Sequence, residues 1–578
     1  MAVIGIDLGT TNSLVVAYQN GKEVIIPNGM NEYLTPSVVS IDENEEVIVG
    51  KLAKERLISH PQQTTSLFKR KMGSTQTIHL KGIDYTPEEL SAMVVKQLVV
   101  DAEQYLHEKV DEIVISVPAY FDSKQRFATK KIGEILGIKV ERLINEPSAA
   151  SIVCHKSDEY ETFIIFDFGG GTLDVSIVDC FENVINVCSI AGDNQLGGSD
   201  FDQAIVLDFC KEHNLDFKAL ETYKQESLIR IAEQTKLALQ KNETVPMVVI
   251  LDKEYKSIYT NQRLREISND IFSKMKLIIG KAVRDSGFQS DELDSLILVG
   301  GSSYMPVVQK FLKELLNIPV IYPEEVDTLV AMGLGKYIGV KQREDNIKDL
   351  VITDVCPFSL SLQSLNESDI TRPYASVIIP KNTTLPCSES SFFTTSRLGQ
   401  TTIGLHVYQG ESLYAQDNLL IGQAQIEVPE NTESNEGIIV TYTYDINSIL
   451  FVEVKVLSTN EKHVFEVKEN AMLKPTQETQ KLDAIKEISL KYHREPDLEL
   501  LRGRVQRIAR EMDVYAMERF KEFIEKMEET LAETSKSPRK TKDKINEYNA
   551  MLDYYEKELN VDDLDVFQKE EDAKGWMS

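Results

Sequence analysis

The sequence predicts a multidomain protein in which an α/β domain, an antiparallel β-sandwich and a helical segment follow one another along the chain. Strand-like apolar runs alternate with helical patterns up to about residue 345, as in α/β proteins. From 355 to about 468 apolar residues recur at every second position, and after Pro475 they recur at spacings of three and four. Such a change of period marks a change of architecture, and a chain of 578 residues is long enough for several domains.

The composition excludes several functional classes. The chain has 63 basic and 92 acidic residues and a formal net charge of −29, which opposes nucleic acid or an anionic membrane as the main partner. No apolar stretch is long enough to span a bilayer, and the start has no basic, cleavable leader, so we expect a cytoplasmic protein. Because the six cysteines lack C-x-x-C spacing and the eight histidines form no ligand set, we expect reduced thiols and no transition-metal site.

A short pattern occurs twice in the α/β region, at 4–12 and at 164–172. In each copy an apolar run meets an aspartate, Asp7 or Asp167, followed by glycine and small hydroxyl residues and then by a second apolar run. This order predicts a buried β-hairpin whose glycine turn lets backbone N–H groups surround a phosphate, while the aspartate holds a hydrated cation. One such turn is usually only a hairpin, but two copies indicate a duplicated, two-lobed nucleotide domain.

Further strands and helices alternate through this region. Strand-like runs precede helical patterns at 123–136 and 306–316. The region ends in a charged stretch at 341–345, which is followed by an apolar stretch between two aspartates at 349–354. From the residues alone, that apolar stretch is equally an interdomain linker or the first strand of the next domain.

The next region has the pattern of an antiparallel sandwich with one apolar face per strand. Apolar residues alternate with other residues at 402–407 and again at 450–456, where they follow a turn at 445–448. An apolar inner face is normally just core, so the alternation by itself does not predict a peptide groove.

Two apolar stripes with 3-4 spacing predict helices at the end of the chain, the first of them beginning at Pro496. The first stripe is Leu498, Leu501, Val505, Ile508, Met512 and Tyr515, and the second is Ile545, Tyr548, Leu552, Tyr555 and Leu559. A basic loop at 535–542 separates them and is most simply a solvated turn. The two stripes most simply pack on each other as a small bundle, with no partner implied.

Several specific motifs appear in order across the chain. Besides the two hairpins, they are 117–121, 144–150, 196–202 and 298–301 in the α/β region, and 381–386 and 407–411 in the sandwich. Together they make the chain resemble the seventy-kilodalton heat-shock chaperone family, of which DnaK is the bacterial type. The short helical end and the short stretch from Gly73 to Thr86 most resemble the HscC branch of that family.

The resemblance implies an actin-like ATPase domain of duplicated, ribonuclease-H-like lobes at 1–347, a linker at 348–354, a peptide-binding β-sandwich at 355–470 and an α-helical lid at 471–578. It implies an ATP-dependent chaperone of the stress response, in which ATP hydrolysis controls the binding of extended hydrophobic segments of unfolded proteins. A J-domain cochaperone is an implied partner, and a nucleotide exchange factor stays open. Two other classes also stay open: an actin-fold small-molecule kinase, and a noncatalytic holdase or exchange factor.

The same resemblance assigns a site for ATP or ADP with Mg²⁺ and K⁺. The catalytic residues would be Lys69, Thr172, Glu146, Asp7 and Asp167, and the metal-binding residues would be Asp7, Asp167, Asp174 and Glu146. The nucleotide contacts would be Gly9, Thr10, Thr11, Asn12, Gly169, Gly170, Gly171, Thr172, Gly197, Gly198, Glu233, Lys236, Gly300, Gly301, Ser302 and Asp327. Without the resemblance, Lys69 would be one of three surface cations, Glu146 a helix-boundary residue and Asp174 an outward-facing strand carboxylate.

The chain departs from the family where adenosine would bind. Tyr304 stands where the family usually has an arginine, and Gln240 stands where it usually has a serine. A tyrosine stacks on adenine but supplies no guanidinium contact. We therefore expect ATP binding to be retained with a changed affinity. Glu233 and Lys236 match residues that hold the ribose, although alone they would be an ordinary surface pair.

The resemblance also assigns residues that bind peptide and residues that transmit the nucleotide state. The peptide pocket would consist of Leu362, Phe393, Ile403, Leu405 and Ile449, with Leu365 and Ser396 forming an arch over the peptide backbone. Pro118 and Arg126 would relay the nucleotide state to the linker residues Asp349, Leu350, Val351 and Ile352. This assignment favours the linker interpretation of 349–354.

Overall fold

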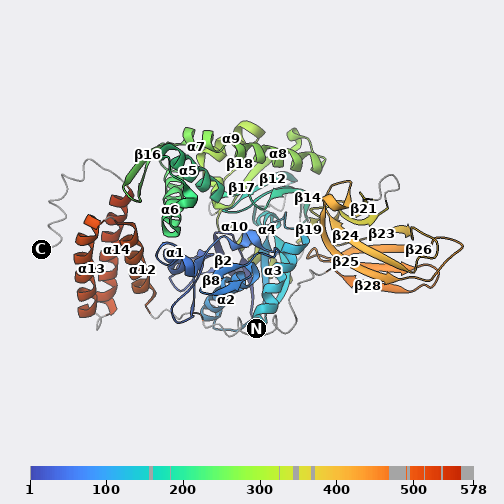
Figure 1. The fold of residues 1–578 in the computed structure, drawn as a ribbon, viewed down its shortest axis with the longest axis horizontal. Helices are drawn as coiled ribbons and strands as arrows, with labels where there is room; N and C mark the ends of the chain where they lie inside the picture. Colours follow the sequence, from blue (N-terminus) through green and yellow to red (C-terminus); the bar gives the residue numbers. More distant parts are fainter. Residues whose placement is uncertain are drawn as a thin grey trace.

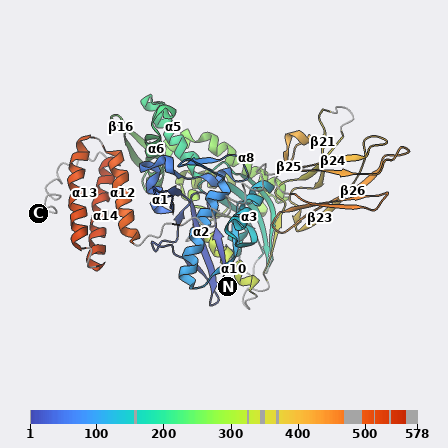
Figure 2. The ribbon, with the colours of Figure 1, turned by 60° about the horizontal axis from the view of Figure 1, so that its bottom comes forward.

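The computed structural model describes residues 2–154, 160–182, 184–323, 326–342, 350–365, 371–467, 490, 495–512, 514–534 and 538–560. A central α/β domain has the β-sandwich at one end and a helical unit at the other (Figure 1). The same order is seen after a 60° turn (Figure 2), so the sandwich and the helical unit lie on opposite sides of the α/β domain. No helix in these ranges is long and apolar enough to cross a membrane.

The first lobe of the α/β domain is built on a mixed sheet around β1. This strand pairs in parallel with β10 and antiparallel with β2. The order is β11 (Lys139–Asn145), β10 (Val110–Val117), β1 (Ala2–Asp7), β2 (Asn12–Gln19) and β3 (Lys22–Ile26), with β4 (Thr35–Pro36) beside β2. Helices α2 (Pro87–Leu106) and α3 (Ser123–Leu136) share one apolar core with this sheet, and α3 has the predicted bounds.

A smaller sheet completes the first lobe and carries helix α1. It contains β5 (Val39–Ile41), β6 (Val47–Val49) and β7 (Thr64–Thr65), and β8 (Ile78–Leu80) and β9 (Ile83–Tyr85) form a separate hairpin. Helix α1 (Lys51–Ser59) packs on this sheet and also contacts α6 of the second lobe. It therefore forms one rim of the cleft between the lobes.

The second lobe repeats the design around β12. Its sheet runs β18 (Val320–Ile321), β17 (Ser295–Val299), β12 (Glu161–Phe168), β13 (Leu173–Phe181), β14 (Val184–Asp193), β19 (Val351–Val355) and β22 (Thr384–Leu385). The remaining elements are α5 (Gly198–His213), α6 (Thr222–Ala238), β15 (Thr244–Ile250), β16 (Glu254–Thr260), α7 (Asn261–Ile267), α8 (Asn269–Ser286) and α9 (Pro306–Leu316). The two predicted hairpins are confirmed as β1–β2 and β12–β13, and α9 has the predicted bounds.

Helices α4 (Glu146–Cys154) and α10 (Leu329–Lys341) pack on each other and connect the two lobes. Their apolar side chains form one core with residues from both large sheets. The two helices approach so closely that a Cβ on Gly333 would lie 1.9 Å from the backbone oxygen of Ala149. A glycine is therefore required at this crossing. The packing of α4 between the lobes places its first residue, Glu146, at the base of the cleft.

The sandwich consists, among the described residues, of two antiparallel sheets. One contains β21 (Tyr374–Ile379), β20 (Leu360–Ser364), β24 (Thr402–Gln409) and β25 (Leu419–Glu427), and the other contains β23 (Cys387–Thr394), β26 (Gly437–Tyr444), β27 (Leu450–Val456) and β28 (Lys462–Glu466). Every second residue of β27 is buried, beginning with Leu450, and β24 buries Leu405 and Val407. The predicted alternation is thus confirmed.

Strand β19 covers most of the apolar stretch at 349–354 and pairs with strands on both of its sides. Its first residues, Val351 to Thr353, lie parallel to β14 of the second lobe. Its last residues, Asp354 and Val355, pair antiparallel with β22 of the sandwich. The same strand therefore has a strand of the second lobe on one side and β22 on the other. Its role as an interdomain linker stays a prediction, and Asp349 lies outside the described residues.

The sandwich also touches the α/β domain directly. The backbone N–H of Ser123 donates to Oε1 of Gln409 at 3.0 Å, and the hydroxyl of Ser148 donates to Oδ2 of Asp354 at 3.0 Å. The side chain of Asn447 accepts a hydrogen bond of 3.1 Å from the backbone N–H of Leu143. These contacts fix the sandwich beside α3, β11 and α4.

The helical unit is made of α12 (Pro496–Glu511), α13 (Val514–Thr534) and α14 (Pro538–Asn560). Its helices share an apolar core, as predicted, and α12 begins at Pro496. The first stripe was predicted too long, because α12 ends at Glu511 and Tyr515 belongs to α13. The basic loop was also predicted too long, because 538–542 form the start of α14, where proline suits a first turn.

The helical unit packs on the α/β domain, although the sequence predicted no partner for it. Helix α12 contacts α1 and α14 contacts β15, so the described helices lie at the end remote from the sandwich (Figure 1). The predicted segment 471–489 lies outside the described residues, as does 561–578. The role of these helices as a lid stays a prediction.

We predict that Ile352→Asp releases β19 from the second lobe. Ile352 is partly buried and packs on the core between the lobes, so a carboxylate there should weaken docking by about 1–3 kcal/mol. Small-angle X-ray scattering should show a larger radius of gyration. Val351→Asp is the matched control, because Val351 is 49% exposed; an equal expansion in both variants would contradict the docking of β19.

Candidate active site

A cavity of about 550 Å³ lies between the two lobes, and both hairpin turns line it. The predicted residues in its wall are Asp7, Gly9, Thr10, Thr11, Asn12, Lys69, Glu146, Asp167, Gly169, Gly170, Thr172, Glu233, Lys236, Gly300, Gly301, Ser302 and Asp327. The predicted residues Gly171, Gly197, Gly198 and Asp174 are not part of the wall formed by the described residues. The structure thus gathers residues from widely separated motifs around one space.

The two hairpin turns face each other at contact distance. A Cβ on Gly170 would lie 1.8 Å from the hydroxyl oxygen of Thr11, and one on Gly171 would lie 2.4 Å from a methyl carbon of Thr10. A Cβ on Gly197 would in turn lie 2.4 Å from the backbone nitrogen of Gly171. Side chains at these glycines would force the turns apart, so glycine is needed for this close approach of the two turns.

Buried carboxylates surround the base of the cavity. Asp7 ends β1 and accepts a hydrogen bond of 2.6 Å from the hydroxyl of Ser116. Burial, reinforced by the nearby charge of Glu146, raises the pKa of Asp7 to about 7. The same two causes raise the pKa of Asp167 well above its usual range.

Asp174 is fully buried behind this cluster, which overturns its interpretation as an outward-facing strand carboxylate. Its Oδ1 accepts a hydrogen bond of 2.8 Å from the backbone N–H of Tyr120. Burial, followed by the charge of Glu146, raises the pKa of Asp174 to about 7. The carboxylate therefore acts on the site through its charge, without touching the cavity.

Lys69 supplies positive charge to the cluster. It lies on a short 3-10 turn, Phe68–Lys71, and is 4% exposed. Its ammonium group lies 3.1 Å from Oε1 of Glu146, and both side chains are almost completely buried. Lys69 is thus not a surface cation, and its neighbour Lys71 is exposed.

The site suits a cation held through water. Carboxylates that are buried together repel one another and favour a bound cation. No group of three or more His, Cys, Asp or Glu side chains in the described part of the chain is arranged to ligate a metal directly. Asp7, Asp167 and Glu146 therefore fit a hydrated ion better than a stripped one, and direct metal binding by these residues stays a prediction.

Arg70 contributes a contact between the lobes that the sequence did not predict. Its Nε donates to the backbone oxygen of Gly171 at 2.9 Å, and its Nη2 donates to Oδ2 of Asp200 at 2.6 Å. The three consecutive cations at 69–71 indicate a basic segment, but they do not show which side chain faces a carboxylate and which faces water.

The residues predicted to hold the ribose have protein partners in this structure. The ammonium group of Lys236 lies 2.8 Å from Asp202 and donates to the backbone oxygen of Gly198 at 3.0 Å. Burial raises the pKa of Asp202 to about 6, although Lys236 lowers it. Glu233 pairs across the cleft with Lys54 at 3.2 Å. Neither Lys54 nor Asp202 was predicted, because both partners are distant in sequence.

The far wall of the cavity contains the two departures from the family pattern. Tyr304 and Gln240 both line it. Gly300 there has φ of 79°, and a Cβ on it would lie 2.6 Å from the backbone oxygen of Phe168. Glycine is therefore needed to bring this wall against the second hairpin.

A buried network joins the cavity to the sandwich. Arg126 is 2% exposed and donates from Nη2 to the side chain of Asn145 at 2.7 Å and to the backbone oxygen of Ala119 at 3.0 Å. Asn145 immediately precedes Glu146. The ring of Tyr120, next to Ala119, lies 4.4 Å from that of Phe358 in the sandwich. The segment after Pro118 thus links the acidic cluster to the second domain.

The predicted peptide-binding residues differ in exposure. Leu362, Leu405 and Ile449 are buried, and Phe393 and Ile403 are partly buried and pack against the sandwich core. Leu365 is 52% exposed, and exposed Ser396 donates from its hydroxyl to Gln400 at 3.2 Å. The pocket residues other than Ile449 therefore belong to the sandwich core or pack against it, while both residues of the predicted arch are accessible.

Comparison with protein families gives a match that spans almost the entire chain. A family model described as Hsp70 protein matches residues 3–80 and 74–576. The match includes the hairpins, the acidic cluster, the sandwich and the helical unit. It does not distinguish branches of the family, so the resemblance to the HscC branch stays a prediction.

We predict that Asp174→Asn removes a pH-dependent loss of stability. The pKa of Asp174 is about 7 in the fold and about 4 in an unfolded chain. Between these pH values the folded chain keeps a proton on Asp174 that the unfolded chain has lost, so stability falls as the pH rises through this range. The free energy of unfolding of the variant minus that of the parent should therefore grow by about 3 kcal/mol from pH 5 to pH 8. Urea denaturation in EDTA without nucleotide measures this, and a difference that shrinks with rising pH would contradict it.

Proposed function

The chain belongs to the Hsp70 protein family, and from this premise we propose that it is a chaperone whose ATP hydrolysis controls the binding of extended apolar peptide segments. Members of the family are ATPases that bind nucleotide with Mg²⁺ and act on unfolded polypeptides. The observation that carries the proposal is the buried Lys69–Glu146 pair beside Asp7 and Asp167, in a cavity lined by both glycine turns.

Lys69 and the turns provide what phosphoryl transfer to water requires. An ammonium group shielded from solvent stabilises charge that develops on the γ-phosphate, and the threonine turns hold the phosphate chain. Thr172 lines the same cavity and is 8% exposed. When bound near Asp7 and Asp167, Mg²⁺ would neutralise phosphate charge, and K⁺ would fit the same excess of carboxylates. Glu146 then positions water, and Lys69 keeps the Glu146 carboxylate in place.

The topology supports an actin-like arrangement for the α/β domain. Two sheets that each contain a phosphate hairpin flank the α4–α10 pair, which is the expected form of duplicated lobes. We propose the limits 1–347 for this domain, 348–354 for the linker, 355–470 for the peptide-binding sandwich and 471–578 for the helical segment. The family implies J-domain cochaperones in general, and we propose one as a partner, with an exchange factor as a second.

Coupling between the two activities has a physical route. The Arg126 network connects Asn145, beside Glu146, to the segment at 119–121 that contacts the sandwich. Strand β19 adds the linker to the second lobe's sheet. A nucleotide that shifts the lobes therefore shifts the surface on which the sandwich docks, and peptide binding must affect the nucleotide site by the same free energy.

The alternative functions account for less of the structure. A small-molecule kinase would not need a sandwich docked through β19, and a noncatalytic relative would not need Lys69, Glu146 and Thr172 in one cavity. Tyr304 is the feature that favours the noncatalytic relative, since it replaces the usual arginine.

We predict that Lys69→Ala lowers the single-turnover rate of ATP hydrolysis by about 100-fold and leaves nucleotide binding measurable. The reason is that the buried ammonium group serves the transition state more than the ground state. Lys71→Ala, on the same turn but exposed, is the matched control and should hydrolyse at the parent's rate. Equal rates for the Lys69 variant and the parent would refute the hydrolytic assignment.

We predict that Ile403→Asp weakens binding of a fluorescent, extended, leucine-rich peptide about tenfold or more, because a partly buried apolar contact is replaced by a carboxylate. Fluorescence anisotropy measures the dissociation constant. Phe392→Asp is the control, since Phe392 is 63% exposed and alternates with inward-facing Phe393. Unchanged affinity in a folded Ile403 variant would place the peptide site elsewhere.

A further inference from the structure

Helix α12 of the helical unit (496–560) lies against the first lobe at the rim of the nucleotide cavity. The side chain of Arg507 forms an ion pair and hydrogen bond with Glu55 on α1. Gly503 packs on the same helix, where a Cβ would lie 3.0 Å from a methyl carbon of Leu52 and 3.6 Å from the Cβ of Glu55. A side chain at 503 would press on Leu52, so α12 lies directly against α1.

The same helix also holds the second lobe. Glu511 accepts a hydrogen bond of 2.9 Å from the hydroxyl of Ser227 and pairs with Arg230 at 3.2 Å. Both partners are on α6, the opposite rim of the cleft. The guanidinium group of Arg510 lies 5.9 Å from the ring of Tyr223, also on α6. One helix therefore contacts both rims.

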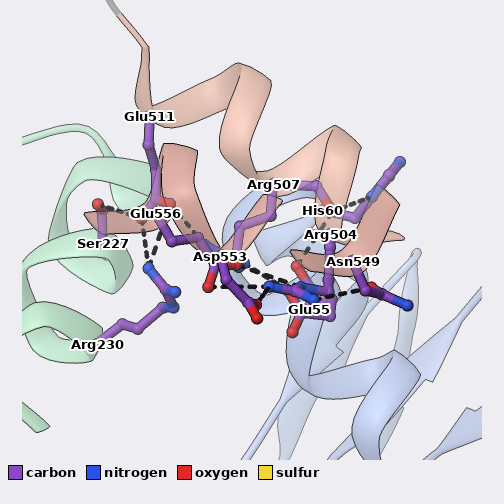
Figure 3. Close-up of polar contacts among 11 residues, drawn as sticks. Glu55, His60, Ser227, Arg230, Arg504, Arg507, Glu511, Asn549, Asp553 and Glu556 are labelled. Atoms are coloured by element: carbon purple, nitrogen blue, oxygen red, sulfur yellow. Dashed lines mark hydrogen bonds and ion pairs between the residues drawn. The ribbon is translucent and has the colours of Figure 1, made fainter. Parts of the chain in front are cut away.

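The contacts with the two lobes form one continuous chain of charges (Figure 3). Arg507 donates from Nη1 to Oε2 of Glu511 at 2.9 Å, one helical turn away. The order across the cleft is therefore Glu55, Arg507, Glu511 and Arg230, with alternating signs. We name this chain the cleft bridge.

Helix α14 supports the cleft bridge from behind. Arg504 of α12 pairs with Asp553 at 2.6 Å and donates to the side chain of Asn549 at 2.8 Å, and Glu556 pairs with Arg507 itself. Residues on α14 thus hold α12 at the angle that reaches both rims. The described residue Leu490, which precedes the unit, pairs with Val47 of the first lobe.

Burial distinguishes the cleft bridge from the direct ion pair between α1 and α6. Arg507 is 2% exposed and Glu511 is 9% exposed, whereas the Lys54–Glu233 pair between α1 and α6 has side chains 41% and 27% exposed. An exposed pair contributes little, but separating a buried pair leaves uncompensated charges. Parting α1 from α6 therefore meets its main polar resistance in the cleft bridge.

The cleft bridge belongs to the wall of the nucleotide cavity. Arg507, Glu55 and Arg230 line the same cavity as Lys69 and Asp167. We propose that the helical unit is an intramolecular clasp on the nucleotide cleft, so that bound nucleotide leaves only after α12 has released one of the two lobes. This inference rests on the proposed nucleotide binding, and it assigns to the C-terminal helices a function separate from covering the sandwich.

Dissociation of a fluorescent mant-ADP from the full chain, chased with unlabelled ADP, tests the clasp. The double variant Arg507→Ala, Glu511→Ala should release mant-ADP about tenfold faster or more, because it removes charge-assisted bonds to both lobes. Arg502→Ala is the matched control on the same helix, since Arg502 pairs with Glu528 inside the helical unit; its release rate should equal the parent's. Accelerated release in the control alone, or in neither variant, would overturn the proposal.

A reversible crosslink tests the clasp without depending on a loss of contacts. The distance of 3.6 Å at position 503 suits a disulfide, whose Cβ atoms lie roughly 3.5–4.5 Å apart, so the pair Glu55→Cys, Gly503→Cys should oxidise readily. The oxidised protein should release mant-ADP about fivefold or more slowly than the same protein after reduction, since an intramolecular link raises the effective concentration of α12 at the cleft. The parent with its own six cysteines, treated identically, controls for the oxidant.

The outcomes separate the inference from the proposed function. A crosslink that forms without slowing release, or that does not form at all, overturns the clasp while leaving ATPase and peptide binding intact. A parent chain that binds no mant-ADP overturns the proposed function, and the clasp with it. Circular dichroism melting of each variant shows that faster release comes from a folded protein.

Discussion

The structure depends on a concentration of buried negative charge at the base of one cleft. Asp7, Glu146, Asp167 and Asp174 lie within electrostatic reach of one another, and the ammonium group of Lys69 is the cation they share there. Such a cluster is costly in a protein interior unless further positive charge enters. The elevated pKa values of Asp7 and Asp174 are the sign of that cost, and the proposed binding of a phosphate with its cation beside the two glycine turns would relieve it.

The cleft has an interaction partner at each end of the α/β domain. The sandwich is connected through β19 and through contacts near Arg126, while the helical unit spans the mouth through Arg507 and Glu511. Breaking either attachment costs free energy, so each attachment influences how far apart the two lobes lie. The helices cannot span the cleft and cover the sandwich at the same time, because these places are on opposite sides of the domain (Figures 1 and 2).

Local sequence patterns predicted the helices and strands better than they predicted which distant residues contact one another. The hairpins, α3, α9 and the alternation of β27 follow from periodicity within one segment. Arg70 pairs with Asp200, and Lys54 with Glu233, and periodicity carries no information about contacts across such separations. Arg507 and Glu511, spaced i and i+4, have the pattern of an ordinary solvated helix face, and only the packing of α12 against α1, α6 and α14 buries them. Asp174 shows the same limit, since without the family resemblance it would be an outward-facing strand carboxylate, whereas it is fully buried.

The central claim is that the nucleotide cleft and the sandwich are coupled. The most direct test is single-turnover ATP hydrolysis by the full chain, with and without a saturating extended apolar peptide. The account predicts faster hydrolysis with peptide, and loss of that acceleration when β19 is released from the second lobe. A hydrolysis rate that the peptide leaves unchanged in the native protein would contradict the account.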